Sequence, residues 1–300
     1  MINKFLHLLV NPISKSTLEF QNPFLTDIQS GEQFNYTNGV VYLLPKDEIA
    51  AKSSKLHLDS DTQFNYRDHY QKDAELFIYF DKKLDKATKH ENQRLHEVIY
   101  KRIKPNSEYI LDVGCGEGWV AKTSVPKNIK VISMDISSIN PQKAVEYYPS
   151  PNHLGLVADA FNLPIKEKSI DTIIASEIME HVADPKLFVL SLYKALVPNG
   201  KLIITTPYNE KVEYSLCVHC NNPTPRHAHI HSFNEHNIST LIPENSSWFS
   251  LKFSNFYLTK LRMHIFLAWM PNWLWKAIDT LANFITKKPS RLLIEITKNL

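Results

Sequence analysis

The chain has 300 residues, of which 43% are hydrophobic and 22% are charged, and these proportions are typical of a globular protein with its own core. The net charge of +3 comes from dispersed Lys and Arg residues, which is too weak a signal for a nucleic-acid binder. Three cysteines are too few for a disulfide framework, and no apolar run reaches the ~18 residues of a membrane span. The expected location is the cytoplasm, or the periphery of a membrane.

Residues 1–46 are predicted to form a small β-rich module. Residues 40–44 have the pattern of a strand, and the preceding Asn38-Gly39 pair is a turn signal. Residues 47–104 follow as a polar linker and N-terminal helices. Helical periodicity extends over residues 63–103, and Pro105 is the expected stop.

From residue 105 the chain alternates between short β-branched strands and helices, which indicates an α/β domain over residues 105–300 with a buried parallel sheet. Strands are expected at 109–113, 130–134, 154–157, 171–175 and 201–205, with later ones at 249–258 and 291–297. The clearest helix is expected over 185–196, with Asn199-Gly200 as its stop. Residues 207–236 form an inserted loop, and residues 264–286 form an amphipathic segment.

Three of the chain's seven glycines, Gly114, Gly116 and Gly118, stand at alternate positions directly after the first strand of this domain. A turn that brings backbone close to a ligand needs residues without a Cβ, and glycine also allows unusual backbone angles. The following helix would offer free N–H groups at its start. Asp112 precedes the first glycine, and the spacing Gly-x-Gly-x-Gly differs from the Gly-x-Gly-x-x-Gly of dinucleotide-binding proteins. The sequence therefore predicts a cofactor loop here.

Two further acidic residues follow the next two strands. Asp135 ends the second strand, 17 residues after Gly118, where a carboxylate can accept hydrogen bonds from both hydroxyls of a ribose. Asp159, with Ala160 beside it, follows the third strand. The bound group is therefore expected to be a nucleoside.

Residues 105–210 resemble the class I S-adenosylmethionine-dependent methyltransferases, with the ubiquinone-type O-methyltransferases among the nearest. The resemblance rests on residues 110–120, on Asp135 and Asp159, on Leu163-Pro164 and on residues 176–182. It implies a Rossmann-like α/β sheet of seven strands, mostly parallel with an antiparallel last strand, and helices on both faces. It also implies S-adenosyl-L-methionine as the cofactor.

The same resemblance implies a role for each residue that matches the family's motifs. Asp112, Gly114 and Gly116 are expected to line the methionine moiety, Asp135 to hold the ribose, and Asp159 to meet the adenine amino group. The full expected cofactor set is Asp112, Gly114, Cys115, Gly116, Asp135, Ile136, Asp159, Ala160 and Ser176.

The N-terminal module resembles the small zinc-ribbon-like module that activates or precedes some methyltransferases. That family places cysteines where Asn11 and Ser14 stand here. The resemblance therefore implies a module that has lost its metal and serves a structural purpose. The alternative is an N-terminal hairpin packed on the main domain.

The candidate catalytic residues are Glu177, Glu180 and His181, just after the fourth strand, where ligands of open α/β sheets bind. On a helical turn the three side chains would face the same side, and two carboxylates with an imidazole suit Mg²⁺, Mn²⁺ or Zn²⁺. Without a metal, His181 is the expected base because its usual pKa of ~6.5 leaves it mostly neutral near pH 7. The structural alternative is that the carboxylates cap or solvate a helix and His181 lies in the core.

Some ubiquinone-type O-methyltransferases carry the same Glu-x-x-Glu-His segment, and so do the small-RNA 3′-terminal 2′-O-methyltransferases. The RNA enzymes add a histidine from a downstream motif, which implies His229 or His231 as a further metal ligand here. Their motif continues with Glu-Trp after an aromatic residue, whereas Asn234-Glu235 follows Phe233 in this chain. This departure puts an RNA substrate in doubt.

A second metal-ligand pattern lies in the inserted loop. Cys-x-x-Cys can chelate zinc through one tight turn, and a structural site needs four ligands. The candidate ligands are Cys217, Cys220, His227, His229 and His231. Free thiols beside a His-rich substrate loop are the alternative. The two metal hypotheses compete for the last two histidines.

The amphipathic segment 264–286 contains three tryptophans around Pro271, namely Trp269, Trp273 and Trp275. Three interpretations stay open: a lid over an apolar substrate, an anchor at a membrane surface, and a packed connecting helix. An apolar or lipid-linked acceptor would suit the first two.

Together these patterns predict an S-adenosylmethionine-dependent methyltransferase that acts on a small-molecule acceptor, with O-methylation expected. The alternative enzyme is a metal-assisted RNA 2′-O-methyltransferase. A non-catalytic partner protein with this fold is the alternative of another class, and the intact set of residues 112–118, Asp135 and Asp159 argues against it.

Overall fold

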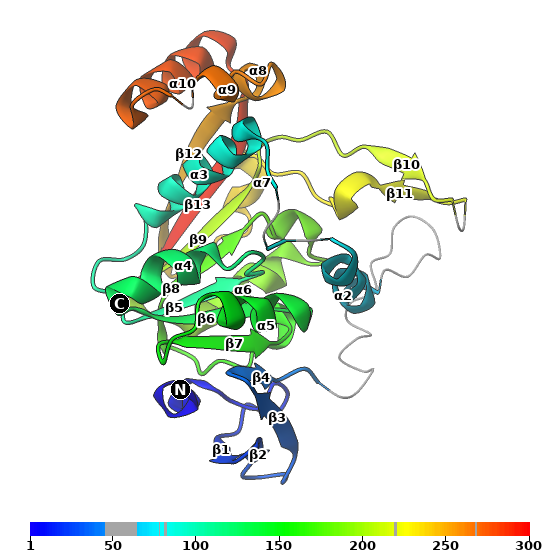
Figure 1. Cartoon of the computed structure of the whole chain (residues 1–300), viewed down its shortest axis with the longest axis vertical. Coiled ribbons are helices and arrows are strands. Elements are labelled where there is room, and N and C mark those ends of the chain that lie inside the picture. The colour runs from blue at the N-terminus through cyan, green and yellow to red at the C-terminus, as the bar shows by residue number, and fades with distance from the viewer. Residues whose placement is uncertain (46–64, 78, 81–82, 219–220, 268) are drawn as a thin grey trace.

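The computed structural model describes residues 1–45, 65–77, 79–80, 83–218, 221–267 and 269–300. One sheet of eleven strands runs through the molecule (Figure 1), in the order β1-β2-β3-β4-β7-β6-β5-β8-β9-β13-β12. Its strands are β1 Leu18–Gln21, β2 Phe24–Asp27, β3 Gln33–Thr37, β4 Val40–Tyr42, β5 Tyr109–Val113, β6 Lys130–Asp135, β7 His153–Val157, β8 Ile170–Ser176, β9 Leu196–Pro207, β12 Ser246–Asn255 and β13 Pro289–Lys298. A separate hairpin consists of β10 Tyr214–Leu216 and β11 Pro223–Pro225.

The α-helices connect these strands and cover the sheet (Figure 1). They are α2 Tyr66–Leu76, α3 Lys86–Tyr100, α4 Trp119–Ser124, α5 Ile139–Tyr147, α6 Pro185–Ala195, α7 Glu235–Ser239, α8 Phe256–Lys260, α9 His264–Leu267 and α10 Asn272–Thr286. Among the described residues, no helix is both long and apolar enough to cross a bilayer.

The predicted seven-stranded core is confirmed. Strands β7, β6, β5, β8 and β9 are mutually parallel, β13 runs antiparallel to β9, and β12 runs antiparallel to β13. Every residue of β5 and β7 is buried, which explains why these strands are mostly apolar on both faces rather than alternating between apolar and polar residues.

Successive strand residues point to opposite faces of the sheet, so each face has its own core. Leu111 of β5 packs in the cluster that includes Phe188 and Leu192 of α6. Its neighbour Ile110 packs in the other cluster, with Ile99 of α3 and residues of α4. Helices therefore cover both faces, as predicted.

Three predicted boundaries were wrong, and side-chain capping explains two of them. The helical stretch 63–103 is divided, because the Asp85 side chain accepts hydrogen bonds from the N–H groups of Ala87 and Thr88 and begins α3 anew. The strand 249–258 ends early, because Asn255 accepts from Tyr257 N and Leu258 N and begins α8. Asn199-Gly200 lies within β9 rather than ending α6, which already stops at Ala195.

The N-terminal module extends the main sheet instead of forming a separate one. Strand β4 pairs in parallel with β7, with Val41 opposite Leu156, and β3, β2 and β1 follow in antiparallel order. The Asn11 side chain accepts from Ile13 N and Ser14 N at 2.8 and 3.1 Å and donates to Asp27 Oδ2 at 2.6 Å. A hydrogen-bonded turn thus stands where the zinc-ribbon family places its cysteines, and the zinc-ribbon origin stays a hypothesis.

Helix α6 offers a matched test of this core. Leu192 is fully buried between α6 and the sheet, whereas Leu187 on the same helix is 54% exposed. Leu192→Ala should lower the free energy of unfolding by about 2–5 kcal/mol, because it removes buried methyl groups and leaves a cavity. Leu187→Ala should change it by less than about 1 kcal/mol. Urea denaturation of both variants measures the difference, and equal effects would contradict the assigned packing.

Candidate functional site

The loop after β5 is shaped by glycines with left-handed backbone angles. Gly114, Gly116 and Gly118 have φ values of 68°, 46° and 66°, which other residues rarely adopt. A Cβ at Gly114 would lie 2.2 Å from the Ile178 side chain. The nearest atom to a Cβ at Gly116 would be 4.0 Å away, so this part of the loop leaves room for a ligand. Gly118 is the N-cap of α4.

Asp112 lies directly beneath this loop and is almost completely buried. Its Oδ2 atom has no hydrogen-bond partner among the described residues. Burial, together with the charge of Asp135, raises the pKa of Asp112 to about 8. A buried, unsatisfied carboxyl group at a strand end is the kind of group that a polar or cationic ligand relieves.

Asp135 ends β6, which pairs with β5, and Asp159 follows β7, which pairs with β6. The Asp135 carboxylate accepts hydrogen bonds from Ser137 N at 2.9 Å and Asn140 Nδ2 at 3.0 Å. Asp159 accepts from Phe161 N at 2.9 Å. Burial raises the pKa of both carboxyl groups. The strand pairs β5–β6 and β6–β7 are parallel, so all three expected cofactor carboxylates occupy one edge of the sheet.

The remaining expected cofactor residues lie along the same edge. Cys115 is buried, and its N–H donates to the Met134 carbonyl at 3.0 Å. Ser176 ends β8, and its hydroxyl is 3.0 Å from Thr205 Oγ1. Ile136 and Ala160 are the residues directly after Asp135 and Asp159, and both are half-buried.

Helix α2 contributes residues that sequence reasoning missed. The Tyr66 hydroxyl donates to Asp159 Oδ2, and Ser138 N donates to Gln71 Oε1 at 2.9 Å. The Tyr70 ring meets the His181 ring edge-on, with 5.9 Å between centroids. Helix α2 therefore touches the site through its first residue and through its middle. The only sequence signal was the aromatic start of this helix, which by itself does not indicate a partner.

Glu177 is held by a guanidinium group from a distant part of the chain. Its Oε2 atom accepts from Arg291 Nη1 at 2.7 Å, and Arg291 Nη2 is 3.3 Å from Glu91 Oε1. The flanking carboxylates raise the pKa of Arg291, so the guanidinium remains charged. Arg291 belongs to β13 and Glu91 to α3. The charge of Glu177 is thus compensated within the protein.

Glu180 and His181 lie on the 3-10 helix Met179–His181 and meet His229 from the inserted loop. One ligand atom of each residue lies within 4.8 Å of the others. The Glu180 side chain is 1% exposed, and neither of its carboxyl oxygens has a hydrogen-bond partner among the described residues. Burial, and secondarily the charge of Glu177, raises the pKa of Glu180. This carboxyl group lacks the compensation that Arg291 gives to Glu177.

Hydrogen bonds fix which ring nitrogens of the two histidines are available. His181 Nδ1 lies 3.2 Å from the Ala228 carbonyl, which can only accept, so this nitrogen carries the hydrogen. His229 Nδ1 lies 2.6 Å from Glu210 Oε2. In both rings the Nε2 lone pair is then left for a proton or a metal. Burial and the neighbouring His229 lower the pKa of His181 to about 4, so this ring is neutral at pH 7.

The structure separates the other candidate metal ligands from this group. Cys217 lies at the tip of the β10–β11 hairpin, directly after β10. His227 lies at the other end of this hairpin, just after β11. The three residue pairs of the hairpin separate the two. Cys220 lies outside the described residues. His231 donates its backbone N–H to the Glu180 carbonyl at 3.2 Å, but only His229 joins Glu180 and His181 among the described residues. The zinc site in the loop stays a prediction.

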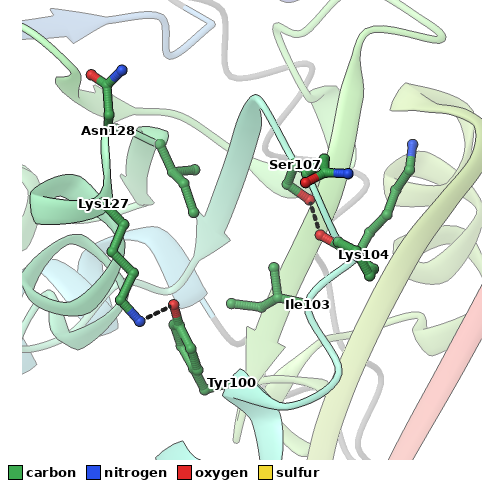
Figure 2. A pocket seen from close by; sticks show the side chains of 9 residues that line it. Tyr100, Ile103, Lys104, Ser107, Lys127 and Asn128 are labelled. Carbon is green, nitrogen blue, oxygen red and sulfur yellow. Dashed lines mark hydrogen bonds between the residues drawn. The ribbon is translucent and has the colours of Figure 1, made fainter.

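A shallow hollow of about 410 Å³ lies at the opposite edge of the sheet (Figure 2). Its lining includes Lys104 and Ser107, which precede β5, and Lys127 and Asn128, which precede β6. Strands β5 and β6 begin at this edge and end at the other one. The hollow is therefore not connected with the carboxylates, glycines and histidines described above.

Comparison with known proteins identifies a methyltransferase domain in this chain. Residues 82–245, more than half of the chain, match the family model described as "Methyltransferase domain". The chain is 30% identical to a ubiquinone biosynthesis O-methyltransferase of Rickettsia akari (strain Hartford) over 134 residues, which cover 44% of this chain and 49% of that protein. It is 34% identical to the protein of the same name from Rickettsia prowazekii (strain Madrid E) over 127 residues, covering 39% and 49%. The chain thus spans about half the length of these curated relatives.

Among solved structures, a protein from Listeria monocytogenes described as an S-adenosylmethionine dependent methyltransferase superimposes with a TM-score of 0.52. The match covers 70% of this chain and 100% of that one at 15% sequence identity. At this level of identity the likeness concerns the fold.

The unsatisfied carboxyl of Asp112 leads to a stability prediction. Its pKa of about 8 in the folded state exceeds the ordinary value of 3.8, so the unfolded chain binds fewer protons and stability declines as the pH rises from 4 to 8. Asp112→Asn should therefore raise the free energy of unfolding, by about 1 kcal/mol or more at pH 8, since one pKa unit corresponds to about 1.4 kcal/mol. The gain should shrink at pH 5.

Denaturant titrations at both pH values measure this gain. The control is Asp171→Asn, because the Asp171 carboxylate accepts from the N–H groups of Glu108 and Tyr109 at 2.9 and 3.0 Å. That variant should lose stability at both pH values. An Asp112→Asn protein that is no more stable than the native one at pH 8 would refute the assignment.

Proposed function

This chain belongs to the class I S-adenosylmethionine-dependent methyltransferases, and we propose that it methylates a hydroxyl oxygen of a small organic acceptor. The observation that carries the proposal is the group of Glu180, His181 and His229 beside the cofactor loop. Ile178, which packs on Gly114, links this group directly to the loop.

The residues at the strand ends fit the cofactor. S-adenosylmethionine supplies an electrophilic methyl group, which bonds to the acceptor oxygen as its bond to sulfur breaks. Asp112 offers a buried carboxyl oxygen, Oδ2, that has no hydrogen-bond partner among the described residues and is suited to a positively charged group. Asp135 is oriented by Ser137 and Asn140, which leaves it in position to accept hydrogen bonds from ribose hydroxyls. Asp159 suits an adenine amino group. The Tyr66 hydroxyl, which donates to Asp159 Oδ2, must then move away or share this carboxylate with the amino group.

Methyl transfer depends mainly on alignment, and a hydroxyl acceptor must also lose its proton. Burial keeps His181 neutral, and its Nδ1–H bond to the Ala228 carbonyl directs Nε2 away from that carbonyl. Nε2 can accept the hydroxyl proton in this arrangement. However, a pKa of about 4 makes His181 a weak base for a hydroxyl group, because such a base gives little driving force for proton transfer.

The same weakness supports a second candidate, in which the three residues hold a divalent metal ion. A metal requires neutral imidazole, and Glu180 provides a carboxylate whose oxygens have no hydrogen-bond partner among the described residues. The Glu210–His229 hydrogen bond is the outer-shell contact typical of a metal-binding histidine. Two imidazoles and one carboxylate fit Zn²⁺ or Mn²⁺ better than Mg²⁺, which prefers oxygen ligands. A bound ion would lower the pKa of an acceptor hydroxyl.

Three observations support a small acceptor over RNA. The named relatives act in ubiquinone biosynthesis, according to their descriptions, although the chain spans only about half their length. Helix α2 also reaches over the site through Tyr66 and Tyr70, which favours an enclosed ligand. The basic residues of the chain remain dispersed, with a net charge of +3.

Calorimetric titration with S-adenosylmethionine tests the cofactor part. Asp135→Ala removes a charged acceptor and should weaken binding by about 1.5–3 kcal/mol, or roughly 10- to 150-fold. Glu146→Ala, an exposed carboxylate on the neighbouring helix α5, is the control and should leave the affinity unchanged. Undiminished affinity of Asp135→Ala would remove this residue from the site, and a preference for NAD would overturn the cofactor assignment.

Chelation tests the metal part, with the methylation of catechol-type hydroxyl acceptors as the readout. Turnover should disappear with chelator and return with Zn²⁺ or Mn²⁺. His229→Ala should weaken metal binding by about 10-fold or more. The matched control His231→Ala should retain the metal, since His231 lies outside the group.

If chelator and His229→Ala leave turnover unchanged, the metal candidate is wrong. His181 would then act as the base, and His181→Ala should lower turnover by about 100-fold or more.

A further inference from the structure

Helix α10 presents polar side chains to the protein. Asp279 accepts hydrogen bonds from Ser254 N and Asn255 N at 3.1 and 2.7 Å. The Asn255 Nδ2 atom donates to Asn283 Oδ1 at 2.9 Å and to Thr286 Oγ1 at 2.8 Å. These contacts attach the helix to the end of β12 through a polar network, supplemented by the buried ring of Trp275.

The opposite face of α10 is apolar and exposed. Trp273 is 70% exposed, Leu281 58%, Phe284 79% and Ile285 68%. Leu281, Phe284 and Ile285 follow Trp273 by 8, 11 and 12 positions, and these spacings place all four residues on one stripe of a helix. A surface helix normally turns its apolar stripe inward. Helix α10 therefore turns Asp279, Asn283 and Thr286 toward the protein together with the ring of Trp275, and it leaves these four large apolar side chains outside.

The segments before α10 continue this exposed apolar surface. Trp269 is 79% exposed, Leu261 68% and Phe266 67%. Helices α8, α9 and α10 lie together at one end of the sheet (Figure 1). We refer to the exposed side chains of residues 256–285 as the apolar end face. Several large exposed apolar side chains on neighbouring segments of a folded protein indicate an interaction site.

Positive charge accompanies the apolar end face. Residues 256–290 contain five basic residues and one acidic residue, and that acidic residue, Asp279, faces β12. The Lys86 ammonium lies 5.1 Å from the Trp269 ring centroid, and the Lys260 ammonium lies 5.4 Å from that of Phe256. Lys287 and Lys288 are exposed and follow directly after α10.

We propose that the apolar end face docks on the surface of an anionic phospholipid bilayer. Exposed tryptophans with lysines at the border suit the boundary between headgroups and acyl chains, and lysines near an anionic surface are attracted to it. A second copy of the chain fits less well, because a symmetric contact would bring the same positive charges together. This inference does not depend on the chemistry of methyl transfer.

The position of the face is consistent with such docking. Strand β12 runs antiparallel to β13, which runs antiparallel to β9, so β12 ends at the same edge of the sheet as the parallel strands. Helix α8 begins directly after β12. Docking would thus hold the substrate edge of the sheet toward the membrane side.

Co-sedimentation of the full chain with vesicles tests the proposal. Vesicles of phosphatidylcholine with phosphatidylglycerol should bind the protein at least about 10-fold more tightly than vesicles of phosphatidylcholine alone. The double variant Trp273→Glu/Phe284→Glu should lose at least about 10-fold in binding to the anionic vesicles. Both side chains are exposed, so this variant should fold, and an unchanged melting temperature verifies that. Ile28→Glu, at a position 55% exposed in the N-terminal module, is the matched control and should bind like the native protein.

Two results would overturn the proposal. One is a native protein that stays in the supernatant with both kinds of vesicle. The other is a stable dimer in sedimentation velocity that the double variant dissociates, since this would assign the face to a second copy of the chain.

Discussion

The parallel register of β7, β6, β5 and β8 is the constraint on which the site depends. Because these strands are parallel and adjacent, the residues at their carboxyl ends are forced together whatever their charge. Asp112, Asp135 and Asp159 consequently share one edge, and burial raises the pKa of all three. Groups that remain polar, buried and incompletely satisfied lower the stability of the ligand-free protein, and their retention is expected where a ligand completes their interactions.

The two glutamates after β8 illustrate how one edge can serve two purposes. Arg291 compensates Glu177 and at the same time joins β13 and α3 to the end of β8, so Glu177 holds the scaffold together. Glu180 forms no ion pair among the described residues and instead lies beside two imidazoles whose Nδ1 atoms are already engaged. A difference in partners, rather than in residue type, separates a carboxylate that stabilises the fold from one suited to chemistry.

The helix that follows the outermost strand, β12, shows a different arrangement. At α10 the side chains of Asp279, Asn283 and Thr286 are satisfied within the protein, by Asn255 and the N–H groups at the end of β12, and four large apolar side chains are left exposed. The carboxyl edge of the parallel strands thus buries polar groups that lack hydrogen-bond partners. The apolar end face instead exposes large apolar side chains to solvent. Both arrangements reduce the stability of the isolated chain, and each is relieved by a different kind of contact.

The sequence by itself determined the strands, the glycine loop and the three carboxylates, because these depend on local patterns: β-branched runs, glycines that adopt positive φ, and acidic residues at strand ends. It also identified Glu177, Glu180 and His181 as a group, but not their different environments. Only the tertiary structure decided that Arg291, 114 positions away, compensates Glu177, and that His229 rather than His231 joins His181. It also decided the orientation of α10, since periodicity identifies an apolar stripe but not the side to which it turns. The face that α10 turns inward depends on the hydrogen-bond partners at the end of β12.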